Sequence, residues 1–229
     1  AASNWNNTST YRFSNAPELG YSAYNLPHMI KASAFYRFHI ANNKNFTTTI
    51  GVIYQGRSGS PYSMLYSGDL NGDNGRGNDL MFIPTDEQID LMPFKAQGNY
   101  TEELQRQNLK AWLAKTPYLK DHRGEYFKRN ADNLPFENHF DFHVAEKMSV
   151  KVGKQVHSLE LSLDILNVGN LLNKDWGRTY GTTYSNELIS PLTYDGGKFQ
   201  FLSTPDYVIK YPQSYYSRWR GQLGLKYTF

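Results

Sequence analysis

The chain closes with the stretch Gly221-Gln222-Leu223-Gly224-Leu225-Lys226-Tyr227-Thr228-Phe229. Counted back from Phe229, every second residue is apolar or small, and the residues between them are Thr, Lys, Gly and Gln. Strict alternation predicts a β-strand with one apolar and one polar face. It is unusual for such a regular strand to end on an aromatic residue with no polar tail after it.

The composition excludes several classes of protein. With 39% hydrophobic residues and a mean hydropathy of −0.64, no run approaches the roughly 18 apolar residues of a spanning helix. A transmembrane β-barrel escapes that test, because only alternate residues face lipid. Aromatic residues make up 15% of the chain, which suits interfacial girdles or a carbohydrate- or peptide-binding surface. The net charge of +3 is spread along the chain without a basic stripe, so no nucleic-acid partner is expected.

The alternation of the last strand recurs in four earlier segments. The five predicted strands cover about residues 29–40, 45–56, 139–151, 158–168 and 214–229. Tight polar turns join them in pairs, at Ala41–Lys44 and at Gly153-Lys154-Gln155. Glu146 interrupts the apolar face of the third strand, which predicts a bulge or an interfacial position there.

Long segments without clean alternation separate the strands. They cover about residues 1–28, 57–137 and 169–213. The second holds one predicted helix, from Thr101 to about Ala114, with Asn99 and Glu102 placed to cap its start. The third holds a minor strand at Lys198–Leu202. Tight turns on one side and long loops on the other favour a transmembrane barrel over a soluble β-sandwich, whose connections are more even.

Five strands are too few for a closed barrel, since the smallest spanning barrel has about 8. An open edge in lipid would leave backbone groups unpaired, at several kcal/mol each. Either the chain is a fragment or other chains supply the missing strands, and a fragment is favoured. The start Ala1-Ala2-Ser3, with neither Met nor a signal peptide, agrees with a processed chain or a piece of a longer one.

Several motifs together point to one family. They are YQGRSGSPYS at 54–63, GDLNGDNG at 68–75 with NDL at 78–80 and Ile83-Pro84, HRGEYFKRNA at 122–131 with LPF at 134–136, DILNVGNLLNK at 164–174, and the terminal Phe229. From about Leu26 to the end, the chain resembles the TonB-dependent outer-membrane receptors of bacteria, in particular their Oar-like branch. In outer-membrane barrels a terminal Phe is the assembly signal.

This resemblance implies an antiparallel transmembrane β-barrel of 22 strands, of which these would be the last five, with long extracellular loops. It also implies an amino-terminal plug and a segment that contacts TonB, neither of which is in this sequence. The implied activity is energised uptake of a large or scarce ligand, such as an oligosaccharide, a peptide or a metal chelate. The expected surroundings are outer-membrane lipid and a surface lipoprotein partner that caps the mouth.

One loop carries the spacing of a calcium site. Asp69, Asn71 and Asp73 follow the pattern D-x-N-x-D, and Asp79 is placed to be a later ligand. Asn74 stands where calcium loops usually have Gly, and Leu80 where they have Glu. The alternative interpretation is a Gly/Asn/Asp turn cluster on a surface loop. A bound calcium would order the loop rather than perform chemistry.

His139, Asp141 and His143 alternate along one face of the third strand. These residue types bind transition metals, but neighbours on one face of a strand lie about 7 Å apart, so an adjacent strand would have to help. The sequence favours a hydrated polar wall of the barrel lumen instead.

Aromatic residues crowd the third long segment and the start of the last strand. Candidates for stacking on a sugar or peptide ligand are Trp176, Tyr180, Tyr184 and Tyr194. The alternative for those near strand ends, which Trp219 favours because it continues the apolar face, is an interfacial aromatic girdle.

The sequence lacks the common catalytic motifs, including G-x-S-x-G, H-E-x-x-H, a P-loop and a Cys nucleophile, so no enzymatic role is expected. The main alternative to transport is a receptor-like barrel that serves as a docking subunit of an outer-membrane protein complex. A barrel enzyme is a third hypothesis, and it requires a nucleophile–base pair that the sequence does not mark.

Overall fold

The structure, a computed structural model, describes residues 8–182 and 188–229 and consists mostly of strands with few helices. Within these residues, no helix has both the length and the apolar character that a membrane crossing requires. The chain divides into two compact units. The sheet unit comprises Leu26–Gly59, Pro135–Tyr180 and Pro212–Phe229. The core unit comprises Ala1–Asn25, Ser60–Leu134 and Gly181–Tyr211.

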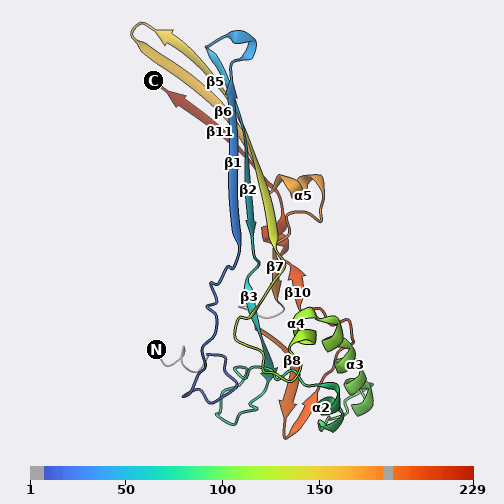
Figure 1. The fold of residues 1–229 in the computed structure, drawn as a ribbon. Coiled ribbons are helices and arrows are strands. Elements are labelled where there is room, and N and C mark those ends of the chain that lie inside the picture. Colours follow the sequence, from blue (N-terminus) through green and yellow to red (C-terminus); the bar gives the residue numbers. More distant parts are fainter. Residues whose placement is uncertain (1–7, 183–187) are drawn as a thin grey trace. The chain divides into compact units, whose positions relative to one another are not determined.

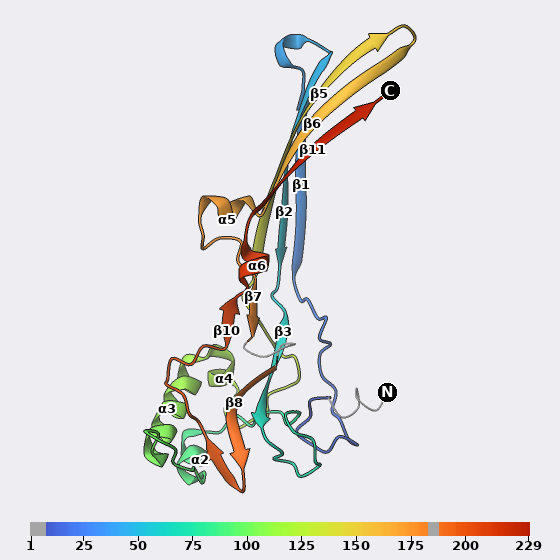
Figure 2. The same ribbon diagram turned by 180° about the vertical axis from the view of Figure 1, so that it is seen from behind.

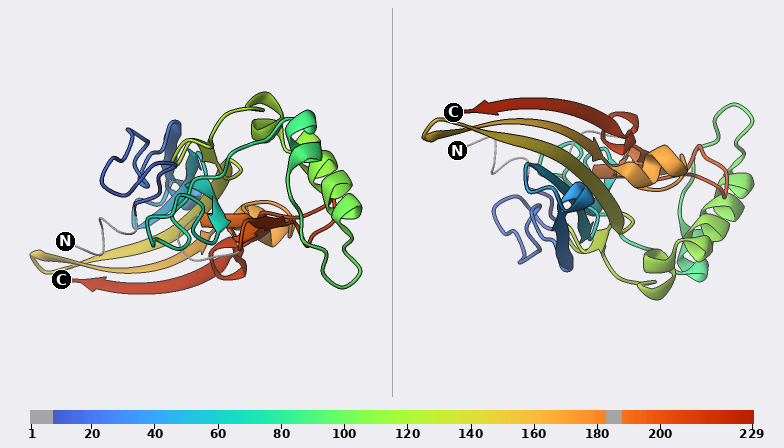
Figure 3. Two further views of the ribbon diagram at one scale, coloured as in Figure 1. Left: turned by 90° about the horizontal axis from the view of Figure 1, so that it is seen from below. Right: turned by 90° about the horizontal axis from the view of Figure 1, so that it is seen from above.

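The sheet unit is built on five antiparallel strands in the spatial order β1-β2-β5-β6-β11 (Figure 1). Their bounds are β1 Met29–Phe38, β2 Phe46–Arg57, β5 Glu137–Val152, β6 Gln155–Leu166 and β11 Arg220–Thr228. Seen end-on, β5, β6 and β11 lie side by side along a curve (Figure 3). The sheet is open, with β1 and β11 at its edges.

The connections of the sheet are short at one end and long at the other. The 3-10 turn η1, Ile40–Asn42, joins β1 to β2, and Gly153 with Lys154 joins β5 to β6. At the opposite end, α5 (Val168–Leu172) follows β6, and α6 (Ser214–Ser217) leads into β11 (Figure 2). The prediction of one strand over 214–229 was therefore wrong at its start, where the first residues form a helical turn.

The register of the sheet places apolar residues in continuous rows on one face. One row runs Tyr36, Ile50, Val144, Leu163 and Leu223, and a second runs Phe46, Met148, Leu159 and Tyr227. Many of these side chains are exposed, with Leu223 76% and Leu225 73% accessible. Among the described residues, Ala145 is the only buried hydrophobic residue in the sheet unit. This sheet therefore has an apolar face but no core of its own.

Glu146 lies on the apolar face without a bulge, so that part of the prediction was wrong. The pairing of β5 with β2 and with β6 runs through this position in unbroken register. The Thr48 hydroxyl donates to one Glu146 carboxylate oxygen, while the other oxygen is buried with no partner among the described residues. Only one of the two Glu146 carboxylate oxygens therefore has a hydrogen-bond partner among the described residues.

The opposite face of the sheet is polar. Lys147, Glu160 and Lys226 lie in one row across three strands, so opposite charges alternate there. On the same face, the Phe35 ring covers Gly51, where an added Cβ would lie 2.3 Å from a ring carbon. Gly51 is therefore required by the close approach of an aromatic ring from the neighbouring strand.

The core unit contains the remaining elements except for the two short pieces β7 (Tyr180–Thr182) and β10 (Lys210–Pro212), which pair with each other. Its four-stranded sheet has the order β4-β3-β8-β9. The strands are β3 Pro61–Ser67, β4 Asp132–Asn133, β8 Leu188–Asp195 and β9 Lys198–Gln200. Its helices are α2 Asp86–Leu91, α3 Glu102–Lys115 and α4 Pro117–Asp121. The strands β3 and β8 pair in parallel although they are far apart in the sequence.

The core unit encloses a hydrophobic core that the sequence analysis treated as loop. The predicted helix is present as α3, but Thr101 caps it by accepting from the Leu104 N–H, so the predicted Asn99 cap was wrong. Trp112 of α3 is 1% exposed, packs against Phe201 and Tyr207, and donates from Nε1 to the Tyr207 carbonyl at 3.2 Å.

We predict that Trp112→Ala destabilises the core unit by about 3–5 kcal/mol, the usual cost of emptying a large aromatic site. In pulse proteolysis of the full-length protein across a urea series, cleavage within 60–134 should begin at lower urea. The matched control is Leu91→Ala at an 85% exposed site, where the change should stay within about 0.5 kcal/mol. Equal cleavage midpoints for both variants would show that this segment has no cooperative core.

Candidate functional site

The core unit holds a polar cavity of about 600 Å³ at the carboxyl ends of the parallel strands β3 and β8. Its lining comes from the end of β3, from the segment after it, and from β8 with the turn that follows it. The lining residues are Ser67, Gly68, Asp69, Arg76, Gly77, Ser190, Thr193, Tyr194, Asp195 and Gly196. They offer one guanidinium, two carboxylates and several hydroxyl groups around one aromatic ring.

Gly68 is required where the cavity wall leaves β3. Its φ of +137° lies in a region that L side chains rarely adopt, and an added Cβ would lie 2.2 Å from the Tyr194 carbonyl oxygen. The backbone of the β8–β9 turn therefore packs directly on the backbone after β3. On the other side, the Tyr194 ring packs against Phe199, with ring centroids 5.0 Å apart.

The predicted calcium residues lie together in the segment that follows Gly68. The Asp69 carboxylate accepts the N–H groups of Gly72, Asp73 and Asn74. Asn71 Oδ1 accepts from the Asp73 N–H at 2.9 Å, and Asp73 Oδ1 from the Gly75 N–H at 2.8 Å. The chain thus turns around its own acidic side chains, in the manner of Asx turns.

Two further groups hold this loop from outside. Ser14 donates to Asp73 Oδ2 through its N–H at 2.9 Å and its hydroxyl at 2.6 Å, and this hydroxyl is the main cause of a lowered Asp73 pKa. Asp79 Oδ2 accepts the N–H groups of Leu70 and Asn71, while burial raises the Asp79 pKa, with the charges of Asp69 and Asp73 adding to the shift. No group of three or more His, Cys, Asp or Glu side chains in the described ranges is gathered for a metal ion.

His139, Asp141 and His143 are not brought together in the structure. His143 Nδ1 lies 2.6 Å from Asp164 Oδ1 on β6, and Asp141 accepts the Asn167 N–H at 2.7 Å. His139 has a third set of partners, described next. Each side chain is thus committed to a different neighbour, as expected for a polar sheet face.

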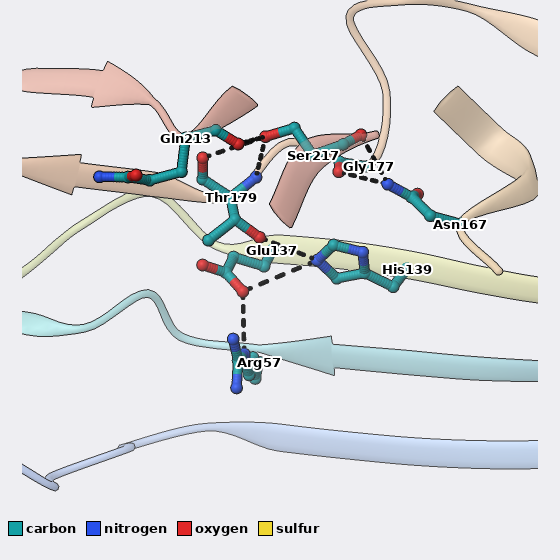
Figure 4. Close-up of polar contacts among 8 residues, drawn as sticks. All are labelled: Arg57, Glu137, His139, Asn167, Gly177, Thr179, Gln213 and Ser217. Carbon is teal, nitrogen blue, oxygen red and sulfur yellow. Dashed lines mark hydrogen bonds and ion pairs between the residues drawn. The ribbon is translucent and has the colours of Figure 1, made fainter. Parts of the chain in front are cut away.

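A polar network lies at the end of the sheet where β2 ends and β5 begins (Figure 4). Arg57 Nε donates to Glu137 Oε2 at 2.8 Å, and Glu137 is 2% exposed. The same carboxylate oxygen lies 3.7 Å from His139 Nε2, which is 3.3 Å from the Thr179 hydroxyl. Removing Arg57 would be costly, since the buried Glu137 carboxylate would lose its partner.

The network continues to the segment that leads into β11. The Ser217 hydroxyl donates to the Gln213 carbonyl at 2.7 Å and accepts from the Thr179 N–H at 3.1 Å. Asn167, in a left-handed conformation at φ 54°, donates to the carbonyls of Ser217 and Gly177. These bonds fix the point at which the chain re-enters the sheet as its last strand.

The network does not have the geometry of a catalytic triad. In a triad, one imidazole nitrogen faces the nucleophile and the other faces the orienting acid. Here Glu137 and Thr179 both approach Nε2 of His139. The arrangement is that of a structural anchor.

The aromatic candidates occupy two separate places. Trp176 and Tyr180 line a cavity of about 310 Å³ in the sheet unit, together with Phe136, Phe140 and Arg178. Phe140 belongs to the apolar face, where its ring lies 4.7 Å from that of Tyr54. Tyr194 lies in the core unit, and Tyr184 is outside the described residues. Trp176 and Tyr180 thus line a different cavity from Tyr194, and their predicted role in stacking on a ligand stays a prediction.

The sequence had singled out Asp69 and Tyr194, but it did not predict most of the other residues that line the polar cavity. Arg76, Ser190 and Asp195 carry no motif, and the parallel pairing of β3 with β8 that gathers them has no local signal. The Arg57–Glu137 pair was also missed. The alternation of the two strands could have indicated it, because both residues lie on the polar face.

Comparison of the chain with protein-family models, with curated proteins and with solved structures finds no match.

Proposed function

We propose that this chain is the carboxy-terminal part of the β-barrel of a TonB-dependent outer-membrane receptor. The observation that carries the proposal is the five-stranded antiparallel sheet with one apolar face, one polar face and no core of its own. A contiguous exposed apolar face of this kind marks a membrane or protein interface. The polar face then belongs to the lumen and the apolar face to lipid.

Strand length supports a membrane-spanning sheet. The five strands have between 9 and 16 residues, compared with the roughly 9–11 that a tilted spanning strand needs. The tight turns lie at one end of the sheet and the long segments at the other, as in outer-membrane barrels. The edges β1 and β11 would pair with further strands in a complete barrel, for which the family resemblance implies 22.

The core unit is then an extracellular ligand-capturing unit, made of the long segments between strands. Its polar cavity presents Arg76, two carboxylates and hydroxyl groups beside Tyr194. A ring to stack on and a mixture of donors and acceptors suit a hydroxyl-rich ligand. Among the implied ligand classes, an oligosaccharide therefore fits best. Plug displacement driven through TonB would carry the ligand inward.

We predict that Arg76→Ala and Tyr194→Ala each weaken oligosaccharide binding about 10-fold or more, because loss of a charged hydrogen-bonding group or a stacking ring costs about 1–3 kcal/mol. Binding is measured on the full receptor with a panel of fluorescent neutral oligosaccharides, and uptake in hosts with and without TonB. Lys198→Ala, at an exposed residue of β9, is the control.

Uptake that needs TonB and falls in both cavity variants would support the proposal. Binding of peptides or metal chelates instead would support the receptor proposal but would change the proposed ligand class. Absence of binding and of TonB-dependent uptake across all three ligand classes would favour the docking-subunit alternative.

We predict that deletion of Phe229 lowers the amount of receptor in the outer membrane far more than it changes ligand affinity, since the terminal aromatic residue acts in assembly. Phe13→Ala, which removes a 59% exposed aromatic side chain from the core unit, is the control. The measurement is the heat-modifiable folded fraction in isolated outer membranes. Normal barrel levels in the truncated protein would contradict the prediction.

A further inference from the structure

The acidic loop of the core unit, residues 69–79, contains buried side-chain oxygens that no hydrogen bond satisfies among the described residues. Asp79 is 2% exposed, and its Oδ1 atom has no hydrogen-bond partner within the described part of the chain. The neighbouring Asn78 is 3% exposed, and its Oδ1 is likewise buried without a partner there. A buried carboxylate oxygen without a partner costs free energy, so such an atom calls for an explanation.

The Asp79 carboxylate lies directly against the loop. Its other oxygen accepts the N–H groups of Leu70 and Asn71, which stand between the acidic residues 69 and 73. Asp79 is thereby held against the loop that carries Asp69 and Asp73.

The backbone of the loop has the turn that a calcium loop needs. Asn74 stands at the sixth position, where Gly is usual, and adopts φ 65°. Asn tolerates this left-handed conformation, so its presence does not count against the motif. The missing Glu at position twelve is replaced by Asp79 one position earlier, which the structure folds back onto the loop.

We propose that this loop binds one calcium ion through side-chain oxygens of Asp69, Asn71, Asp73 and Asp79. Calcium takes six to eight oxygen ligands, including carboxylates, amide oxygens, carbonyls and water, in flexible geometry. An ionised carboxylate has about four lone-pair positions, so its bonds to backbone N–H groups leave room for a cation. No three of these carboxylates are gathered for an ion in the described ranges, so the ligands would have to converge on it. The turn itself is already formed without the ion.

The site would also shape the polar cavity. Asp69 belongs to both, and Arg76 and Gly77 follow the loop directly in the cavity wall. Calcium would fix the segment that positions Arg76. This second consequence rests on the proposed function, whereas ion binding does not.

The test uses the full receptor in detergent, stripped with a chelator and titrated with calcium chloride in a calorimeter, without oligosaccharide or TonB. We expect one ion per chain in the loop, with a Kd of about 10⁻³ M or tighter, the range of extracellular calcium modules. Asp69→Asn and Asp79→Asn should each weaken binding at least 10-fold. Asp195→Asn, in the same cavity wall but outside the loop, should bind as the wild type does.

Thermal unfolding of each chelated variant shows whether it is folded. If Asp79→Asn fails to fold, Asp69→Asn at a partly exposed site carries the test alone. No saturable binding up to 10 mM calcium, or binding that Asp69→Asn leaves unchanged, would overturn the proposal. Because no transported ligand is present, either outcome is independent of whether the chain takes up oligosaccharides.

Discussion

The five-stranded sheet depends on one constraint: among the described residues of its own unit, nothing covers its apolar face. A sheet in water must bury such a face against a second layer. In the sheet unit, Leu223 and Leu225 stay largely exposed, and Ala145 is the only described hydrophobic residue of that unit that is buried. The proposed lipid surrounding would remove the need for a second layer, and it would account for the charges on the opposite face.

The polar contacts of the sheet unit follow from the same constraint. In the proposed barrel, backbone groups would have to be paired within a closed set of strands, so the position at which each strand enters the sheet would matter. The Arg57–Glu137 pair and the Asn167 and Ser217 bonds lie where β2 ends, β5 begins and the chain approaches β11. Their role in fixing these entry points explains why so many polar groups gather there without forming a catalytic arrangement.

The sequence predicted the sheet well because its signal is local. A period of two identifies a strand and its faces from neighbouring residues alone, and the predicted strand over 45–56 compares with Phe46–Arg57 in the structure. The core unit was missed because its signal is not local. The parallel pairing of Ser63 with Leu188 joins distant segments, and Trp112 is buried by residues near position 200. The helix α3, with its own periodicity, was found there, and the minor strand predicted at Lys198–Leu202 is present as β9.

The spacing of the acidic loop leaves two interpretations open, and the structure adds an observation that the spacing does not contain. The spacing of Asp69, Asn71 and Asp73 is compatible with both a calcium loop and an ordinary turn cluster, and hydrogen bonds inside the loop suit either. Asp79 is the observation that favours the proposed calcium site. An ordinary surface turn does not require a further carboxylate to be buried with one of its oxygens unpaired. In the proposed site, the ion would compensate the desolvation of Asp79.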